Sequence, residues 1–246
     1  MQQLDLQIIA AKLESYEETI ISRLIDRAQF HADLRCYEPG HSGFSGETNR
    51  SLFDLRLHYQ EKTDSLFGRF CVPEERPFTR GLEPPKRKVI LPKVSLNIDD
   101  YNKVSVTDSV LESYLKLIPK LCPEGDDLQY GSCVEKDVYA VQAIARRIHY
   151  GALYVGESKY RSNPDLYSSL INKCDTEAII ELITRKDVED QIIERIRIKT
   201  GKTQETVNRL IRNTIDPDTV AEFYLNVIIP LTKKGEVLYL MNRGKN

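Results

Sequence analysis

The chain has 246 residues, of which 41% are hydrophobic and 29% charged, so it is long enough to bury a large core and does not have the composition of a disordered protein. Its 35 Lys and Arg residues against 37 Asp and Glu residues leave a net charge of -2. This balance gives no electrostatic basis for binding nucleic acid or an anionic membrane, so any cationic site must be local.

The 3.6-residue period of an α-helix dominates the N-terminal half. It predicts a long first helix over 3–30 and, after a glycine-rich loop, a second helix over about 52–69. Five prolines then predict a proline-rich loop over about 72–94, because proline disrupts regular helix. Residues 88–98 alternate enough for a short strand, but Pro92 and the lack of a partner strand favour an extended covering segment.

Helical spacing resumes after this loop and predicts seven further helices, over about 106–120, 132–160, 164–173, 175–184, 187–200, 203–213 and 217–243. Asp175 and Thr203 are expected to cap two of them. Pro217 suits a first helical turn, whereas Pro230 lies within a helical pattern and should kink it. The elements predict an all-α fold, a single-domain bundle of roughly ten to twelve helices spanning residues 1–246.

The predicted helix over 132–160 is the most informative element of the chain. Ser132 and Glu135 have the spacing of a capping box at its start. Apolar residues then recur so densely that burial on most sides is expected, yet the helix carries Arg147 and Lys159. Because buried cations need an anionic partner or ligand, this helix predicts an acidic ligand.

Other motifs indicate little. The G-x-x-G-x-x-G pattern over 40–46 has no preceding strand and no P-loop lysine, which favours a flexible loop over a phosphate cradle. Residues 203–213 imitate a DNA-reading helix, but the neutral chain favours a solvated face. The five cysteines contain no C-x-x-C pair, and the four histidines lack zinc-ligand spacing. With no signal sequence and no long apolar run, a cytoplasmic protein with reduced thiols is expected.

Several long segments occur in a fixed order: LDLQ, EETIISRLIDRAQF, SLFDL, GRFCVPEERPF, GSCVEKD, ARRIHYG, ESKY, VEDQIIER and IIPLTKKGEVLYL. In this order they resemble the all-helical chorismate mutases of yeast and plants, and the resemblance covers nearly the whole chain. It implies a chorismate mutase II-like fold. A shared fold does not by itself determine the function, which depends on the residues of the site.

The resemblance implies an isomerase of aromatic amino acid biosynthesis that rearranges the dianion chorismate to prephenate in one pericyclic step, without cofactor or metal. Arg147 matches the family arginine that holds a substrate carboxylate, and Lys159 matches the lysine that donates to the ether oxygen. Glu189 matches the glutamate that accepts from the substrate hydroxyl. Thr232 and Glu236, four residues apart on one helix face, match the threonine and glutamate that complete the site.

If Glu236 also faces the ether oxygen, its carboxyl group must be protonated to donate, and burial beside a dianion favours that form. Higher activity at mildly acidic pH follows. Without the resemblance, Glu189 is simply a solvated helical carboxylate that Arg185 can pair with at i, i+4.

The chain departs from the family at the second carboxylate clamp. The family arginine in the first helix corresponds here to Ala10, and the loss of such a bidentate contact is worth on the order of a hundredfold in rate. Arg185 stands where an asparagine is expected, so it is predicted to restore the missing charge from another helix.

The spacing before Lys159 also differs, because one extra residue lies between Gly151 and Lys159. At about 100° per residue, twelve steps from Arg147 rotate the lysine by roughly 120°, whereas eleven nearly return it to the same face. A single π-turn near Gly151 or Gly156 can absorb the extra residue. Without it, Ser158 would face the site instead.

The yeast and plant enzymes are homodimers that bind an aromatic amino acid at the dimer interface. By resemblance, Arg69, Gly131 and Ser132 occupy the positions of that effector site, which implies a tyrosine or tryptophan effector held partly by helix N-terminal N–H groups. No nucleic acid or membrane partner is expected. The alternative to an active enzyme is an impaired mutase-like protein that binds aromatic metabolites or a protein partner, which would explain Ala10 directly.

Overall fold

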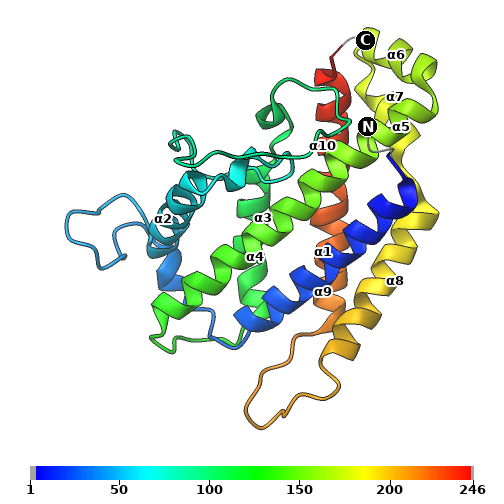
Figure 1. Cartoon of the computed structure of the whole chain (residues 1–246). Helices are drawn as coiled ribbons and strands as arrows, with labels where there is room; N and C mark the ends of the chain where they lie inside the picture. The colour runs from blue at the N-terminus through cyan, green and yellow to red at the C-terminus, as the bar shows by residue number, and fades with distance from the viewer. Residues whose placement is uncertain (1–3, 245–246) are drawn as a thin grey trace.

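The computed structural model describes residues 4–244, which are all-helical and contain no β-strand (Figure 1). The all-α prediction is therefore confirmed. The predicted helix number is wrong: residues 4–244 contain ten α-helical segments, but π-turns join two pairs of them end to end, which leaves eight continuous helices in this range. Within the described residues, no helix is both long and apolar enough to cross a bilayer.

Two long helices lie side by side through the middle of the molecule (Figure 1). α1 (Leu6–Arg27) begins after Asp5, whose side chain accepts a hydrogen bond from the Gln7 N–H at 2.8 Å. It packs along α4 (Tyr130–Tyr150). The predicted start of the first helix at residue 3 lies outside the described residues. The shared core is built from fully buried aliphatic side chains of both helices, including Ile20, Ile21, Leu24, Val134, Val138, Val141, Ile144 and Ile148.

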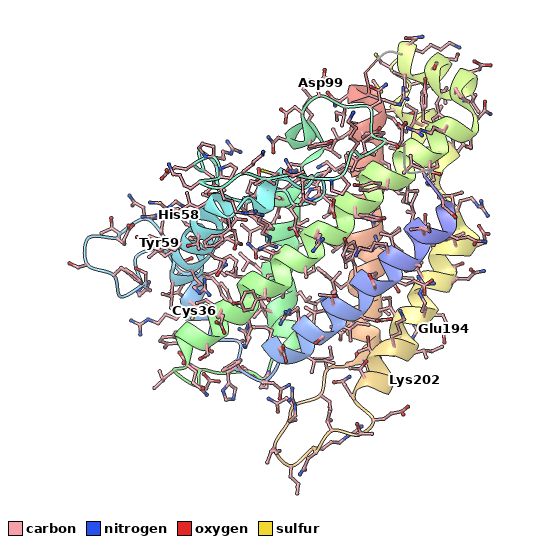
Figure 2. The ribbon with its side chains drawn as sticks, viewed as in Figure 1. Cys36, His58, Tyr59, Asp99, Glu194 and Lys202 are labelled. Atoms are coloured by element: carbon pink, nitrogen blue, oxygen red, sulfur yellow. The ribbon has the colours of Figure 1, made fainter. Side chains whose placement is uncertain are left out.

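The other elements surround this pair. α8 (Lys186–Thr203) borders α1 on one side, and its Glu194 and Lys202 point outward (Figure 2). The predicted cap at Asp175 is confirmed, because its carboxylate accepts from the Ala178 N–H at 3.0 Å. The surrounding α-helices are α2 (Leu52–Leu66), α3 (Thr107–Leu121), α6 (Pro164–Asn172), α7 (Thr176–Ile183) and α8 (Lys186–Thr203), and the short 3-10 turns are Leu34–Tyr37, Arg69–Cys71 and Tyr101–Val104.

The predicted π-turn is present. Residues Gly151–Val155 form it and join α4 end to end with α5 (Gly156–Ser162). The three segments make one continuous helical rod. A π-turn adds one residue to a helical turn, so it absorbs the extra residue before Lys159. Gly151 is required here because a Cβ atom would lie 2.7 Å from Cγ2 of Thr232. The π-turn therefore brings this rod into close contact with the C-terminal helix.

The C-terminal rod has the same construction. α9 (Pro217–Phe223) starts with a proline in its first turn, as predicted, after Asp216, whose carboxylate accepts from two backbone N–H groups. A second π-turn, Tyr224–Ile228, then leads into α10 (Ile229–Asn242). The irregularity expected at Pro230 takes this form, since a wider turn relieves the clash that a mid-helix proline makes with the preceding turn.

Two local predictions are wrong. The helix at Tyr130 begins earlier than the predicted capping box, so Ser132 lies inside its first turn, and Glu135 instead lies near Arg56 and Lys136. The predicted helix over 203–213 is absent: Thr203 ends α8, and the following residues form turns. Its apolar residues find no core to bury against, and the side chain of Leu210 is 92% exposed.

The proline-rich segment runs as predicted without helix or strand, from residue 72 to residue 100. Buried polar groups fix its start. The carboxylate of Glu61 accepts from the N–H groups of Phe78 and Thr79 at 3.0 and 2.7 Å. The guanidinium of Arg76 donates to the carbonyls of Phe70 and Val72. The segment is thus held against α2 although it has no secondary structure of its own.

One buried ion pair ties α1 to α4. The Arg27 Nε donates to Oδ1 of Asp137 at 2.6 Å, and both side chains are fully buried. Tyr37 and Tyr114 donate to the same carboxylate at 2.8 Å each. Burial raises the pKa of Asp137, and the neighbouring guanidinium and hydroxyl donors oppose that rise. A fully satisfied pair of this kind fixes how the two helices meet.

Candidate active site

Arg147 lies at the C-terminal end of α4 and faces α10. Its Nη1 donates to Oγ1 of Thr232 at 2.9 Å, and that hydroxyl donates to the carbonyl of Ile228 at 2.7 Å. The ring of Tyr224 lies 5.8 Å from the guanidinium carbon. Only 3% of Arg147 is exposed, and its Nε has no hydrogen-bond partner.

The guanidinium of Arg147 differs from that of Arg27 in its partners. Arg27 has a buried carboxylate, whereas none lies within 4 Å of Arg147 among residues 4–244. A buried cation without a counter-ion is costly unless an anion can reach it. The charge of Arg147 acts on the Glu236 carboxyl group, but no carboxylate among residues 4–244 contacts the guanidinium directly, so an anionic ligand can bind to it.

Lys159 and Glu236 form a second pair between the same two helical rods, because Lys159 lies on α5, which continues α4, and Glu236 lies on α10. The Lys159 Nζ lies 2.8 Å from Oε2 of Glu236, and it also donates to the carbonyl of Ile183 at 2.9 Å. Burial raises the pKa of the Glu236 carboxyl group, and the positive charges of Lys159, Arg147 and Lys233 oppose that rise. The π-turn thus delivers Lys159 to the helix face that carries Thr232 and Glu236.

Glu189 lies in the first turn of α8 and pairs across to α10. Its Oε1 is 2.9 Å from the Nζ of Lys233, and both side chains are mostly buried. The i, i+4 pair between Glu189 and Arg185 is not formed. Arg185 is the residue before α8 and has non-helical backbone (φ -125°, ψ 86°), so the helical i, i+4 geometry does not apply to it. Its side chain pairs with Asp187 at 3.1 Å and is 65% exposed.

The structure therefore pairs four of the six predicted site residues, Arg147 with Thr232 and Lys159 with Glu236, and brings Glu189 to the same helix, α10, through Lys233. It does not bring Arg185 among their contacts. Ala10 is exposed on α1. The neighbouring side chains of α1 that face the first π-turn are apolar: Ile9 packs with Tyr150, and Leu13 lies near Gly151. No charge from these residues of α1 replaces the missing clamp.

Lys233 is a site residue that the sequence analysis missed. It follows Thr232 directly and lies in the same turn as Glu236, so a helical projection of α10 would have placed it near both. With Lys233, the site holds three cations and two carboxylates. Burial raises the pKa of the Glu236 carboxyl group, so this group loses its negative charge more readily than an ordinary glutamate. The charge balance of the site is therefore positive and favours an anionic ligand.

The three residues predicted for an effector site do not meet within one chain. The guanidinium of Arg69 donates to Asp64, Glu75 and Gln142 at 2.7, 3.1 and 2.6 Å. Gly131 and Ser132 are exposed in the first turn of α4. Because Gln142 is ten residues further along that helix, Arg69 lies about 15 Å from Ser132 along the helix axis.

The chain is similar to known proteins over nearly its whole length. The chain is 38% identical to a chorismate mutase of Trichoderma parareesei and 36% identical to one of Schizosaccharomyces pombe, over 98% of this chain and 93% and 97% of theirs. Its fold matches the Aro7p chorismate mutase of Candida albicans in complex with L-Trp, with a TM-score of 0.89 and 32% identity over 98% of this chain and 92% of that one. It also matches AtCM1 with phenylalanine bound in its allosteric site, with a TM-score of 0.84 and 31% identity over 96% and 94%. No protein-family model matches the chain.

Proposed function

The chain belongs to the chorismate mutase family, and we propose from this premise that it is an isomerase that converts chorismate to prephenate by an intramolecular Claisen rearrangement. The buried Arg147, which has a hydroxyl partner but no carboxylate partner, is the single observation that best supports this function. A dianionic substrate supplies the missing negative charge.

The reaction needs positioning and electrostatic stabilisation rather than a nucleophile. One ether bond breaks while a carbon–carbon bond forms between two ends of the same molecule, so holding the folded conformer removes much of the entropic cost. In the proposed mechanism, Arg147 binds one carboxylate, oriented by Thr232. Lys159 and protonated Glu236 donate to the ether oxygen as it gains negative charge, and Glu189 accepts from the substrate hydroxyl.

The direct test is loss of chorismate with the purified protein, with the product identified as prephenate. Conversion well above the uncatalysed rate would support the proposed enzyme. Binding of chorismate without conversion would support the alternative, an impaired mutase-like protein that retains the site but lacks the second clamp at Ala10.

The activity should depend on pH through Glu236. Because burial raises the pKa of its carboxyl group, the protonated form persists to higher pH than in an ordinary glutamate. Donation to the ether oxygen is lost as the pH rises through that pKa. We therefore expect kcat/KM to be highest at mildly acidic pH and to fall by up to about tenfold per pH unit above the pKa.

The Glu236→Gln variant tests this prediction, because an amide donates at every pH and should flatten the alkaline fall. Glu194→Gln, on the outward side of α8, is the matched control and should keep the wild-type profile. A Glu236→Gln profile that falls as steeply as that of the wild type would contradict this role.

We further propose a homodimer with an aromatic amino acid site shared between subunits. Arg69 is far from Gly131 and Ser132 within one chain, so the three can meet only if a second copy supplies the helix N-terminus. The matched structures, one in complex with L-Trp and one with phenylalanine bound in its allosteric site, support an aromatic amino acid as the ligand of this site.

Tryptophan and tyrosine should therefore change the rate of chorismate conversion in the wild type. The Arg69→Ala variant should lose that response, whereas Arg80→Ala, on an exposed loop, should keep it. A monomer in light scattering, or an unchanged response of Arg69→Ala, would count against the shared site.

A further inference from the structure

The substrate dianion leaves one carboxylate without a partner in this site. Arg147 can bind one carboxylate, and the position of the second clamp is the exposed Ala10. We propose that Lys233 binds the second carboxylate and is a catalytic residue in this chain. This inference rests on the proposed mutase function and assigns a residue to its substrate.

The position of Lys233 on α10 supports this role. Successive residues of an α-helix are rotated by about 100°, so Lys233 projects about 60° from Glu236 and about 100° from Thr232. All three therefore lie on one side of the helix, with Glu236 between the other two. A ligand that touches both Thr232 and Glu236 is within reach of the four-carbon side chain of Lys233.

The surroundings of Lys233 also suit a carboxylate ligand. Its side chain is 23% exposed, and its Nζ lies 2.9 Å from Oε1 of Glu189. The ammonium group has three donors, so it can keep this contact and still donate to a substrate carboxylate. Glu189 thus holds the lysine extended toward the site before substrate arrives.

Competing cations are already engaged elsewhere. The guanidinium of Arg185 is paired with Asp187 and is largely exposed, and Lys12 lies over the ring of Tyr16. On α8, Arg195 donates through two nitrogens to the fully buried Glu17. Lys233 is the cation next to the Thr232–Glu236 face whose partner, Glu189, itself belongs to the site.

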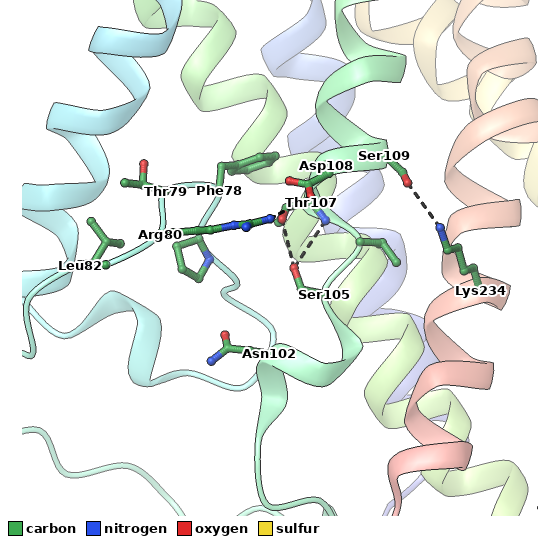
Figure 3. Close-up of a pocket in the computed structure, with 13 residues that line it drawn as sticks. Phe78, Thr79, Arg80, Leu82, Asn102, Ser105, Thr107, Asp108, Ser109 and Lys234 are labelled. Atoms are coloured by element: carbon green, nitrogen blue, oxygen red, sulfur yellow. Dashed lines mark hydrogen bonds and ion pairs between the residues drawn. The ribbon is translucent and has the colours of Figure 1, made fainter.

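The neighbouring Lys234 provides a matched control. Its Nζ lies 3.5 Å from Oγ of Ser109 and lines a separate hollow of about 670 Å³, formed with the segment 77–82 and the start of α3 (Figure 3). The hollow is lined by residues other than those proposed to bind the substrate. Lys233→Met and Lys234→Met therefore make the same chemical change on two sides of one helix.

The experiment measures kcat/KM for chorismate and the Kd of prephenate by calorimetry in the full-length protein. Lys233→Met should lower kcat/KM by about a hundredfold and weaken prephenate binding, whereas Lys234→Met should match the wild type. Lys233→Arg, which keeps the charge, should retain most of the activity. In an Ala10→Arg background, Lys233→Met should cost less than about tenfold, because the family clamp is restored.

The outcomes separate the two claims. A wild-type protein that does not convert chorismate would refute the proposed function itself. An active wild type together with wild-type kcat/KM in Lys233→Met would overturn only the assignment of Lys233. A larger loss in Arg185→Asn than in Lys233→Met would assign the second clamp to Arg185 instead, and equal losses in Lys233→Met and Lys233→Arg would indicate a role in packing rather than in binding charge.

Discussion

Replacing Arg147 with alanine is expected to lower kcat/KM for chorismate by about a thousandfold, the largest effect of any single substitution in this site. The guanidinium is buried and has a hydroxyl partner, so its charge is reserved for the substrate. Its removal leaves a substrate carboxylate in a dry site without a counter-ion. Both ground-state binding and the rate of the bound substrate should suffer, which a full kinetic analysis will show.

The adjacent arginine is the matched control. Arg146 points to the other side of α4, where it pairs with Glu74 and Glu75 at 3.4 and 3.2 Å. Arg146→Ala should therefore change stability more than kcat/KM. If Arg147→Ala and Arg146→Ala lose the same small amount of activity, Arg147 does not bind the substrate.

Replacing Lys159 with methionine should lower kcat by about a hundredfold to a thousandfold, the range typical of losing one donor to a developing oxyanion. The side chain keeps its length and apolar stem but can no longer donate to the ether oxygen. Since the negative charge on that oxygen develops in the transition state, kcat should fall more than the affinity for chorismate. Single-turnover kinetics under saturating chorismate would measure this directly.

Lys173→Met, an exposed lysine outside the site, is the control for the loss of a charge. The Lys159→Met variant also loses the ion pair with Glu236, so its alkaline limb should move to higher pH as the carboxyl group holds its proton more tightly. Wild-type kcat in Lys159→Met would mean that the π-turn does not bring this lysine to the ether oxygen.

The sequence was sufficient for the long helices and insufficient for their ends. Periodicity located the first helix and the core helix at Tyr130–Tyr150 because their buried faces are long and continuous. It failed over 203–213, where an apolar pattern exists but no neighbouring surface buries it. It also placed a capping box at Ser132, because spacing alone cannot show that the preceding loop already starts the helix at Tyr130.

The site was predicted where residues belong to regular helices. The family resemblance assigns Thr232 and Glu236, and their i, i+4 spacing places them on one helix face. Counting rotation per residue shows that a π-turn before Lys159 can return it to that face, and the structure has this turn. The position of Arg185 could not be predicted in this way, because it precedes α8 and a helical projection does not apply to it. A helical projection of α10 places Lys233 near Thr232 and Glu236, but its contact with Glu189 could not be predicted, because Glu189 lies on a different helix and the two meet only in the folded chain.

The π-turn at Gly151–Val155 also determines how this chain should be aligned with its relatives. An inserted residue inside a regular α-helix would rotate every later side chain, yet here the insertion is confined to five residues. We therefore expect residues before Gly151 and after Val155 to keep their structural equivalents in the relatives, with the gap of the alignment between those positions. An alignment that places the gap beyond Lys159 would pair this lysine with the wrong column, and the enzyme would be misread as lacking it.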